Sequence, residues 1–189
     1  MIKKIIKAIA KVISFVLLIP LFILYFMRLF SFASYSQLLS LVPGVFGIAL
    51  RQVWYKLTLE KCGSNVYIDF LSVIFTPRAR LGNNVFIGVF CTIDLADIGN
   101  DVMLASYTKV LCGSKQHGIK RLEIPMRQQQ GKIERVTIGN DCWICTGAII
   151  MADVANHSVV GAGSVVTKKF APYDIIAGVP AKRIKSRKS

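Results

Sequence analysis

The sequence predicts an all-β domain of the parallel β-helix type, preceded by an apolar helical segment. Two observations carry this prediction. Between Ile68 and Val166, aliphatic residues return every six positions, and several are followed directly by glycine. Residues 1–50 form two nearly uncharged stretches with basic residues at both ends. A third observation concerns function, because the repeat is broken once, over residues 112–137, and the break contains His117.

The composition narrows the class of protein. The chain has 189 residues, enough for one domain and an appendage. It carries 24 Lys and Arg against 10 Asp and Glu, a net charge of +14, which indicates an anionic partner. Because the apolar residues are concentrated at the N-terminus, we expect this partner to be a membrane. No basic patch interleaved with stacking aromatics is evident, so we expect no nucleic-acid partner.

The five cysteines are odd in number and scattered, which favours reduced cytoplasmic thiols over a disulfide framework. Cys142-Trp-Ile-Cys145 has the spacing of a redox motif or half a zinc site. Both cysteines, however, lie inside the six-residue repeat at positions where small residues recur. No second CxxC completes a four-cysteine site, so we predict no metal.

The N-terminal segment begins with a basic amphipathic stretch, MIKKIIKAIAK, followed by uncharged residues 12–27 and 29–50. A signal peptide would need a small-residue cleavage site, and none is clear. A single span needs roughly 20 apolar residues, and the first run is shorter and contains Pro20. Two short helices, re-entrant or lying in the interface, fit better. A buried helical hairpin of a soluble protein is the alternative.

Both flanks of this segment are basic, with four lysines before it and Arg51, Lys56 and Lys61 after it. Positive charge marks the cytoplasmic side, so the chain should cross the bilayer either twice or not at all. We therefore predict that residues 1–58 form a membrane-associating unit. Residues 1–50 would attach it to the cytoplasmic face of the inner membrane.

A six-residue repeat is too short for a helical solenoid and predicts a β-helix in which each hexapeptide forms one short strand and a turn. The aliphatic residues would fill the interior, and the glycines would allow tight corners. This domain is expected over residues 59–189, with a projecting loop at 112–137 and a basic C-terminal tail. The aliphatic–glycine pairs are Leu81-Gly82, Ile87-Gly88, Ile98-Gly99 and Ile138-Gly139.

Residues 138–187 contain IGNDCWI, VVGAGSVVTK and AGVPAKRI, in that order. This succession resembles the C-terminal half of hexapeptide-repeat acyltransferases, above all the sugar O-acetyltransferases of bacterial polysaccharide synthesis. The resemblance covers about residues 60–187, and the segment SQLLSLVPGVFGIALRQVWYKLTLEKCG also resembles the leader of a membrane-associated subgroup. It implies a left-handed parallel β-helix, an exception to the usual right-handed crossover. It also implies a homotrimer with active sites between subunits, and acetyl-coenzyme A as donor.

The resemblance identifies His117 as the general base carried by the projecting loop. The chemistry agrees, because transfer to an alcohol needs a base that is neutral near pH 7 and accepts a proton as attack begins. A solvated loop histidine is the alternative. The other histidine, His157, lies within the repeat and is expected to be a turn residue.

The resemblance also implies a donor site. Trp143 would lie near the pantetheine arm, with ordinary surface packing as the alternative. Thr146 would lie close to the thioester, where its hydroxyl or a nearby backbone N–H meets the developing oxyanion. Ala162 would hydrogen-bond the pantetheine amides through its backbone.

Basic residues further along would serve the nucleotide end of the donor. Thr167 and Lys168 would approach the adenosine. Lys182 and Lys185 would face the phosphates as point charges, with a solvated basic tail as the alternative.

The sequence departs from the family pattern near the acceptor. Phe90 precedes Cys91-Thr-Ile where relatives that act on small free sugars have asparagine, which puts that acceptor contact in doubt. Asp94 and Asp97 lie nearby; turn roles are expected for both, with orientation of the acceptor or of the histidine as the alternative. Cys145 replaces a usual glycine.

The function expected is transfer of an acetyl group from acetyl-coenzyme A to a sugar hydroxyl. The acceptor would be a sugar or lipid-linked glycan, a bacterial surface-polysaccharide precursor at the membrane. One alternative is an N-acetyltransferase of an amino sugar, and another is a non-catalytic β-helical membrane scaffold. The γ-class carbonic anhydrases share the β-helix but need three histidines around zinc, and this chain has two.

Overall fold

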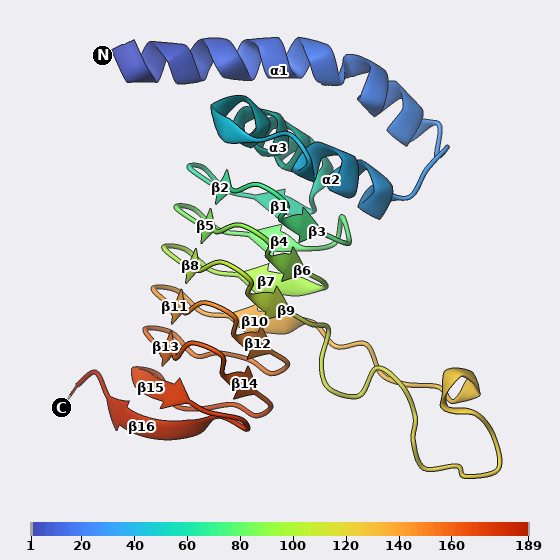
Figure 1. Ribbon diagram of the computed structural model, residues 1–189, viewed down its shortest axis with the longest axis vertical. Helices are drawn as coiled ribbons and strands as arrows, with labels where there is room; N and C mark the ends of the chain where they lie inside the picture. Colours follow the sequence, from blue (N-terminus) through green and yellow to red (C-terminus); the bar gives the residue numbers. More distant parts are fainter. Residues whose placement is uncertain (1, 189) are drawn as a thin grey trace.

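A helical cap and a β-solenoid make up the chain (Figure 1). The computed structural model describes residues 2–188, and residues 2–7 only as helical backbone. The cap consists of α1 (Ile2–Phe26), α2 (Phe32–Ser40) and α3 (Gly44–Thr58). It lies across one end of the solenoid, against the first coil.

The solenoid has three sides, each a parallel sheet of very short strands. Sheet A contains β1 (Lys61–Cys62), β4 (Arg80–Leu81), β7 (Ala96–Ile98) and β10 (Val136–Ile138). Sheet B contains β2 (Tyr67–Ile68), β5 (Phe86–Ile87), β8 (Met103–Leu104), β11 (Trp143–Ile144), β13 (Val159–Val160), β15 (Asp174–Ala177) and, antiparallel at its end, β16 (Lys182–Ser186). Sheet C contains β3 (Val73–Ile74), β6 (Thr92–Ile93), β9 (Lys109–Val110), β12 (Ile149–Ile150) and β14 (Val165–Val166).

The aliphatic residues of the six-residue repeat form the interior. In sheet B the second residue of each parallel two-residue strand points inward and is fully buried, as in Ile68, Leu104 and Ile144. Because each strand pairs with the strand one coil away, these side chains stack along the axis. The prediction of a parallel β-solenoid is confirmed. Its left-handedness stays a prediction.

The corner between sheets A and B requires a left-handed backbone in every coil. Asparagine, aspartate and histidine adopt this conformation more readily than most residues. His157 occupies one of these positions with φ 63°, which confirms its prediction as a turn residue. The complete column is Asn65, Asn84, Asp101, Asp141, His157 and Tyr173.

Glycine follows the sheet A strands because successive coils approach closely there. A Cβ on Gly82 would lie 2.5 Å from the carbonyl oxygen of Gly99 in the next coil. No side chain fits in that space without separating the two coils. This contact explains the pairs Leu81-Gly82, Ile98-Gly99 and Ile138-Gly139; Ile87-Gly88 follows β5 of sheet B, where a Cβ would lie 2.8 Å from the backbone nitrogen of Ser106.

The expectation of two short N-terminal helices is wrong. α1 is one continuous helix of 25 residues that includes Pro20, and it bends toward its C-terminal end. A proline in a helix removes one backbone hydrogen bond and kinks the helix without always ending it. The stretch Ala8–Phe26 is therefore long and apolar enough to cross a membrane by length and composition.

Arg51 joins the cap to the solenoid. Its side chain is fully buried. Nη1 donates to the carbonyl oxygens of Leu39 and Val42 at 2.9 and 2.8 Å, and Nε donates to that of Ile68 at 3.0 Å. The carbonyl of Leu39 belongs to the last turn of α2, and that of Val42 to the segment that follows this helix. Burial lowers the pKa of Arg51 from its ordinary value.

Replacing Arg51 should destabilise the fold strongly. Arg51→Met leaves the carbonyls of α2 and β2 buried and unpaired, so we expect the free energy of unfolding to fall by roughly 2–5 kcal/mol. Lys56→Met on the same helix is the matched control. Its ammonium also bonds backbone carbonyls, those of Cys62 and Gly63, but it is exposed. Denaturant unfolding of both variants gives the comparison, and equal losses would contradict the role assigned to Arg51.

Candidate active site

A single long loop projects from the coils between β9 and β10, over residues 111–135 (Figure 1). It occupies the predicted break, except that Val136 and Thr137 already belong to β10. The register of the solenoid is unaffected, because Trp143 of β11 pairs directly with Met103 of β8. The loop is therefore an insertion that leaves the coils in place.

The loop has internal order built around Gln129, whose side chain is buried although its neighbours are exposed. The Gln129 amide accepts from the backbone N–H of Arg121 at 3.1 Å. It donates to the carbonyl of Arg121 at 2.6 Å and to that of Ile124 at 3.1 Å. Nearby, His117 and Gln130 form an antiparallel bridge between the two arms of the loop. The arm that carries His117 is thus held in a defined position.

His117 is exposed and lines a hollow of about 800 Å³. Every residue that lines the hollow belongs to the loop itself, between Lys115 and Lys132. Lys115, Lys120, Arg121 and Lys132 make its rim basic. Within the described part of the chain, the imidazole ring has no hydrogen-bond partner, so an acceptor hydroxyl would find it free.

Thr146 and Ala162 lie in successive coils on the corner between sheets B and C. The N–H of Gly163 donates to the carbonyl of Thr146 at 2.9 Å, which fixes the spacing of the two coils. Both residues are exposed. Trp143, three residues before Thr146 on β11, is 48% exposed on the outer face of sheet B. The structure therefore brings these three predicted donor residues to one edge.

The residues at the left-handed positions of this edge differ along the solenoid. In the coils nearer the cap its left-handed positions are Leu71, Phe90 and Tyr107, and the rings of the last two stack 5.0 Å apart. In the following coils the same positions are Gly147 and Gly163. A Cβ on Gly163 would meet nothing within 4 Å, so the surface beside Ala162 is open.

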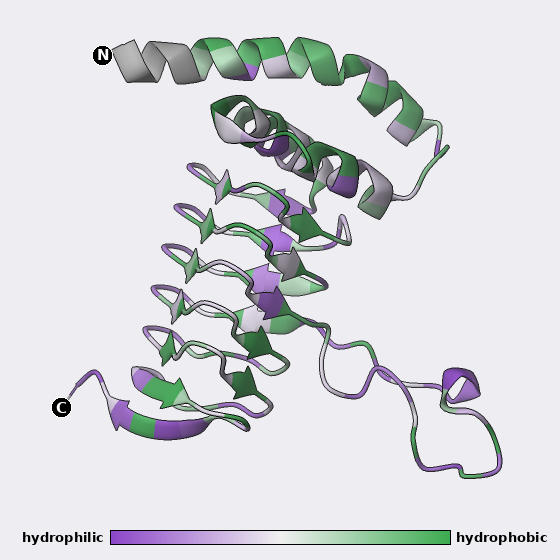
Figure 2. Cartoon of the chain, viewed as in Figure 1, coloured by the Kyte–Doolittle hydropathy of each residue, from purple (hydrophilic) through white to green (hydrophobic). Residues whose placement is uncertain are grey.

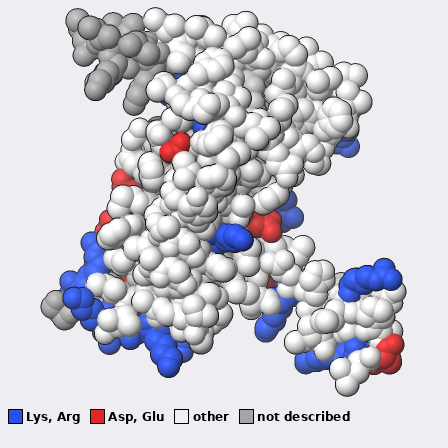
Figure 3. All heavy atoms as spheres, viewed as in Figure 1, with Lys and Arg blue, Asp and Glu red and all other residues white. Residues whose placement is uncertain are grey.

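Thr167 and Lys168 lie at a different place, after β14 and at the root of the loop. They share a groove of about 690 Å³ with Lys115, Lys132 and other residues of the loop base. Lys182 and Lys185 lie on β16, which closes the far end of sheet B. Figure 3 shows lysines and arginines gathered near the C-terminal end of the solenoid.

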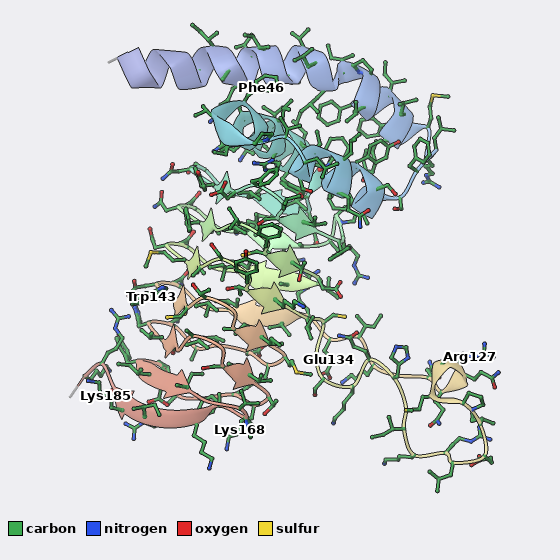
Figure 4. All side chains as sticks on the ribbon, viewed as in Figure 1. Phe46, Arg127, Glu134, Trp143, Lys168 and Lys185 are labelled. Atoms are coloured by element: carbon green, nitrogen blue, oxygen red, sulfur yellow. The ribbon has the colours of Figure 1, made fainter. Side chains whose placement is uncertain are left out.

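One copy of the chain does not assemble all the predicted site residues. In Figure 4, Trp143 lies on the side of the solenoid opposite the loop, whose tip carries Arg127. Lys168 and Lys185 lie below Trp143, near the last coils. The hollow with His117 and the groove with Lys168 adjoin, since Lys115 and Lys132 line both. The edge with Trp143 is a separate feature of a single chain.

The carboxylates near the loop have structural partners. Asp97 lies in β7, so its predicted turn role is wrong; it forms ion pairs with Arg80 and Arg135. Asp94 follows β6 and accepts from the N–H of Leu95, as the predicted turn role requires.

The thiols of the described cysteines are free and poor nucleophiles. Burial, together with the hydrogen bond that the Cys112 thiol donates to the Asp94 carboxylate, raises the pKa of Cys112 to about 11. Burial also raises the pKa values of Cys142 and Cys145, which fits structural positions in the coils.

Two features of the site were not predicted from the sequence. The change from Phe90 and Tyr107 to Gly147 and Gly163 has a sequence signal, since these residues recur at the coil spacing once the inserted loop is subtracted. Gln129 has no such signal, because it is one of three consecutive glutamines and only the folded loop distinguishes it.

Comparison with known proteins finds similar acyltransferases. No protein-family model matches the chain. It is 50% identical over 52 residues to a chloramphenicol acetyltransferase of Morganella morganii, a match that covers 26% of this chain and 25% of the relative. It is 30% identical over 122 residues to WbbJ of Escherichia coli (strain K12), which is named as an O-acetyl transferase of lipopolysaccharide biosynthesis, and this match covers 60% of each chain.

Solved structures of acyltransferases have a similar fold. A maltose O-acetyltransferase from Clostridium difficile 630 superposes with a TM-score of 0.65 at 20% identity, over 82% of this chain and 85% of that one. A mutant of AntD, an N-acyltransferase from Bacillus cereus solved with dTDP and coenzyme A, superposes with a TM-score of 0.55 at 25% identity, over 72% and 88%.

The parallel solenoid with its single histidine-bearing loop has the fold of these solved acyltransferases, and parts of the sequence are similar to relatives named as acetyltransferases. The curated relatives described above are matched over between a quarter and about 60% of their own length.

The order of the loop should depend on Gln129. Gln129→Ala removes the three hydrogen bonds that close the distal part of the loop, so trypsin should cleave after Arg121 and Arg127 several-fold faster than in the unchanged protein. Gln128→Ala removes an exposed neighbour and is the matched control. Equal cleavage rates in the two variants would show that the Gln129 contacts do not hold the loop.

Proposed function

We propose that the chain is an acetyltransferase that moves an acetyl group from acetyl-coenzyme A to a sugar hydroxyl. The acceptor is a bacterial surface-polysaccharide precursor at the membrane. The observation that carries the proposal is His117, a free histidine on the one loop that interrupts the coils of a hexapeptide-repeat protein. Relatives named as acetyltransferases and the AntD structure that holds coenzyme A support the donor.

In the proposed reaction, His117 takes the proton of the acceptor hydroxyl while its oxygen attacks the thioester carbonyl carbon. The hydroxyl of Thr146 or a neighbouring backbone N–H meets the oxyanion that develops. When the intermediate collapses, the carbon–sulfur bond breaks and coenzyme A leaves. The imidazolium then returns its proton to the departing sulfur. The thioester is already activated, so this route requires no metal.

The donor is proposed to lie along the edge that carries Trp143, Thr146 and Ala162. The open surface beside Gly163 leaves room for an extended pantetheine arm. Thr167 and Lys168 are proposed for the adenosine end, and the exposed Lys182 and Lys185 for the phosphates.

A homotrimer is proposed to complete the site, because the edge with Trp143 and the hollow with His117 are separate in one chain. The loop exposes apolar side chains, of which Leu122 is 95% exposed, and the outer face of sheet B exposes Phe86, Met103 and Trp143. Exposed apolar groups of this kind favour burial between subunits. Closed rotational symmetry would supply each edge with the loop of a neighbour.

The membrane part of the proposal rests on the N-terminal segment. Residues 1–50 are proposed to attach the protein to the cytoplasmic face of the inner membrane, where acetyl-coenzyme A is made. A lipid-linked glycan acceptor would explain why an acetyltransferase carries such a segment. The apolar stretch Ala8–Phe26 supports attachment.

N-acylation of an amino sugar is the second candidate. The observation that favours it is the similarity to AntD, an N-acyltransferase solved with coenzyme A and dTDP. Mass spectrometry of surface glycans from cells with and without the protein separates the two. Loss of an acetyl group from oxygen supports the first candidate, and loss from nitrogen supports the second. Glycans that do not change in either position would favour a non-catalytic scaffold.

Removing the base should abolish most of the turnover. His117→Ala should lower kcat by roughly 10²–10⁴, the usual contribution of a general base, while coenzyme A still binds. The matched control is His157→Asn, because asparagine suits the left-handed corner that His157 occupies. Turnover is measured with acetyl-coenzyme A and a panel of sugar acceptors. A near-normal rate in His117→Ala would exclude this residue from the chemistry.

Blocking the donor edge should weaken coenzyme A binding. Ala162→Trp should obstruct the edge by volume, and Lys182→Ala with Lys185→Ala should weaken binding most at low salt, because charge pairing to phosphate is screened. Two other exposed lysines of the coils, Lys61 and Lys109, changed together to alanine, are the control. Calorimetric titration provides the affinities. Unchanged affinity in both site variants would mean that the donor binds elsewhere.

A further inference from the structure

We infer that the cap binds one leaflet of a bilayer with α1 lying in the membrane plane, so that the solenoid stands end-on to the membrane. The inference rests on the membrane attachment proposed above and goes beyond it by choosing among a single span, a two-span hairpin and a surface helix. Its tests do not depend on acetyl transfer.

The first observation is the packing of α1 along α3. Ser14 and Leu18 are fully buried on the inner face of α1. Toward its C-terminal end, the ring of Phe22 stacks on Trp54 of α3 at 5.2 Å, and Tyr25 meets Trp54 edge-on at 5.3 Å. Aromatic pairs of this geometry add to the stabilisation from burial. A span across the bilayer would separate α1 from this surface.

The direction of α1 follows from this packing. The helix runs across the end of the solenoid rather than along its axis (Figure 1). If α1 crossed the bilayer in this arrangement, the solenoid would have to lie against lipid. Its outer faces carry Arg80, Asp97 and Arg135 in ion pairs, which lipid would not accommodate.

The second observation is an apolar surface that faces away from the solenoid. Figure 2 shows the described part of α1 as mostly hydrophobic around its circumference, although only one stripe of it is buried. Val16 is 57% exposed, and neighbouring positions of α2 and α3 add to the surface. Exposed apolar side chains in such number are rare on a soluble monomer and mark an interaction site. The apolar patch of the cap consists of the exposed side chains of Ile9, Val12, Ile13, Phe15, Val16, Leu17, Ile19, Ile23, Phe26, Met27, Leu29, Phe30, Leu38, Leu41 and Phe46.

The third observation is charge. The sequence has no aspartate or glutamate before Glu60, but several lysines and arginines. Lys11 is placed on the solenoid side of α1, where it lines a hollow of about 280 Å³ with Gln52 and Lys56 of α3. A helix in the membrane plane would hold this lysine at the level of the lipid headgroups. Anionic headgroups attract such residues by about 1 kcal/mol each.

These observations favour a bilayer over a protein as the occupant. The patch covers three helices and carries no acidic group that would pair with a basic protein partner. An amphipathic arrangement with apolar residues outward and cations toward the headgroups is the pattern of interfacial helices. Membrane binding of the whole cap, rather than insertion of α1 alone, is what the packing requires.

Vesicle binding by the full-length protein tests the surface. Val16→Glu places a charge on the exposed face of α1 without touching its packed stripe, and Val179→Glu places one at the exposed turn between β15 and β16, at the opposite end of the solenoid. With vesicles of phosphatidylglycerol and phosphatidylcholine, we expect the first variant to bind at least about tenfold more weakly and the second to bind normally. Circular dichroism verifies that both are folded. Unchanged binding of Val16→Glu, or an equal loss in both, would overturn the inference.

Topology in cells tests the orientation. A cysteine at Leu29, between α1 and α2, and a tag at the N-terminus are probed in intact cells with a membrane-impermeant maleimide and with external protease. A helix in the plane of the cytoplasmic leaflet leaves both unmodified. Labelling at Leu29→Cys would indicate a two-span hairpin, and cleavage of the tag would indicate a single span; either would overturn the inference. Glycan acetylation, measured in the same cells, can fail or persist independently of these results.

Discussion

The rest of the structure depends on the in-register stacking of coils. Each short strand bonds to the strands one coil above and below, so every position has fixed neighbours along the axis, as Met103 has in Phe86 and Trp143. Parallel pairing of this kind satisfies the backbone only if each coil brings its strands back into phase with those of the preceding coil. Aliphatic residues inside, left-handed residues at the corners and glycine at the closest approach are all consequences.

The same constraint explains why function requires a loop. Side chains on the outside of a solenoid form columns, and a column offers an edge or a flat face rather than an enclosed cavity. Chemistry needs groups that converge. An insertion between β9 and β10 lets the chain leave the coils and return in register, because Thr137 pairs with Asp97 as if the loop were absent. The cost is that His117 leaves the surface of its own coils, which is why a neighbouring subunit is proposed to complete the site.

The periodic part of the molecule could be predicted from the sequence. The contacts between side chains and partners that lie far apart along the chain could not. The six-residue period of the aliphatic residues corresponds directly to the buried aliphatic column. It therefore predicts the solenoid, the loop and the turn position of His157. Arg51 reads as a flanking charge in the sequence, but in the fold it bonds three carbonyls that lie apart along the chain. Asp97 and Gln129 are similar cases. Their partners are determined by the folded chain, and no periodic pattern in the sequence indicates them. The length of α1 is also hidden in the sequence, because Pro20 interrupts the apolar run. Only the packing of α1 against α3 shows that the helix continues past this proline.

The two ends of the molecule differ, and the proposed function uses both. The cap lies at one end, fixed to the first coil by Arg51, and the basic hairpin of β15 and β16 lies at the other. Along the edge between sheets B and C, Phe90 and Tyr107 come before Gly147 and Gly163 in the direction away from the cap. Under the proposed function, a membrane-borne acceptor approaches from the aromatic side and the donor from the glycine side. Thr146, immediately before Gly147, marks the coil where the two would meet. A solenoid standing end-on to the membrane keeps this coil at a fixed height above the lipid, because the coils between it and the cap cannot change in number or spacing.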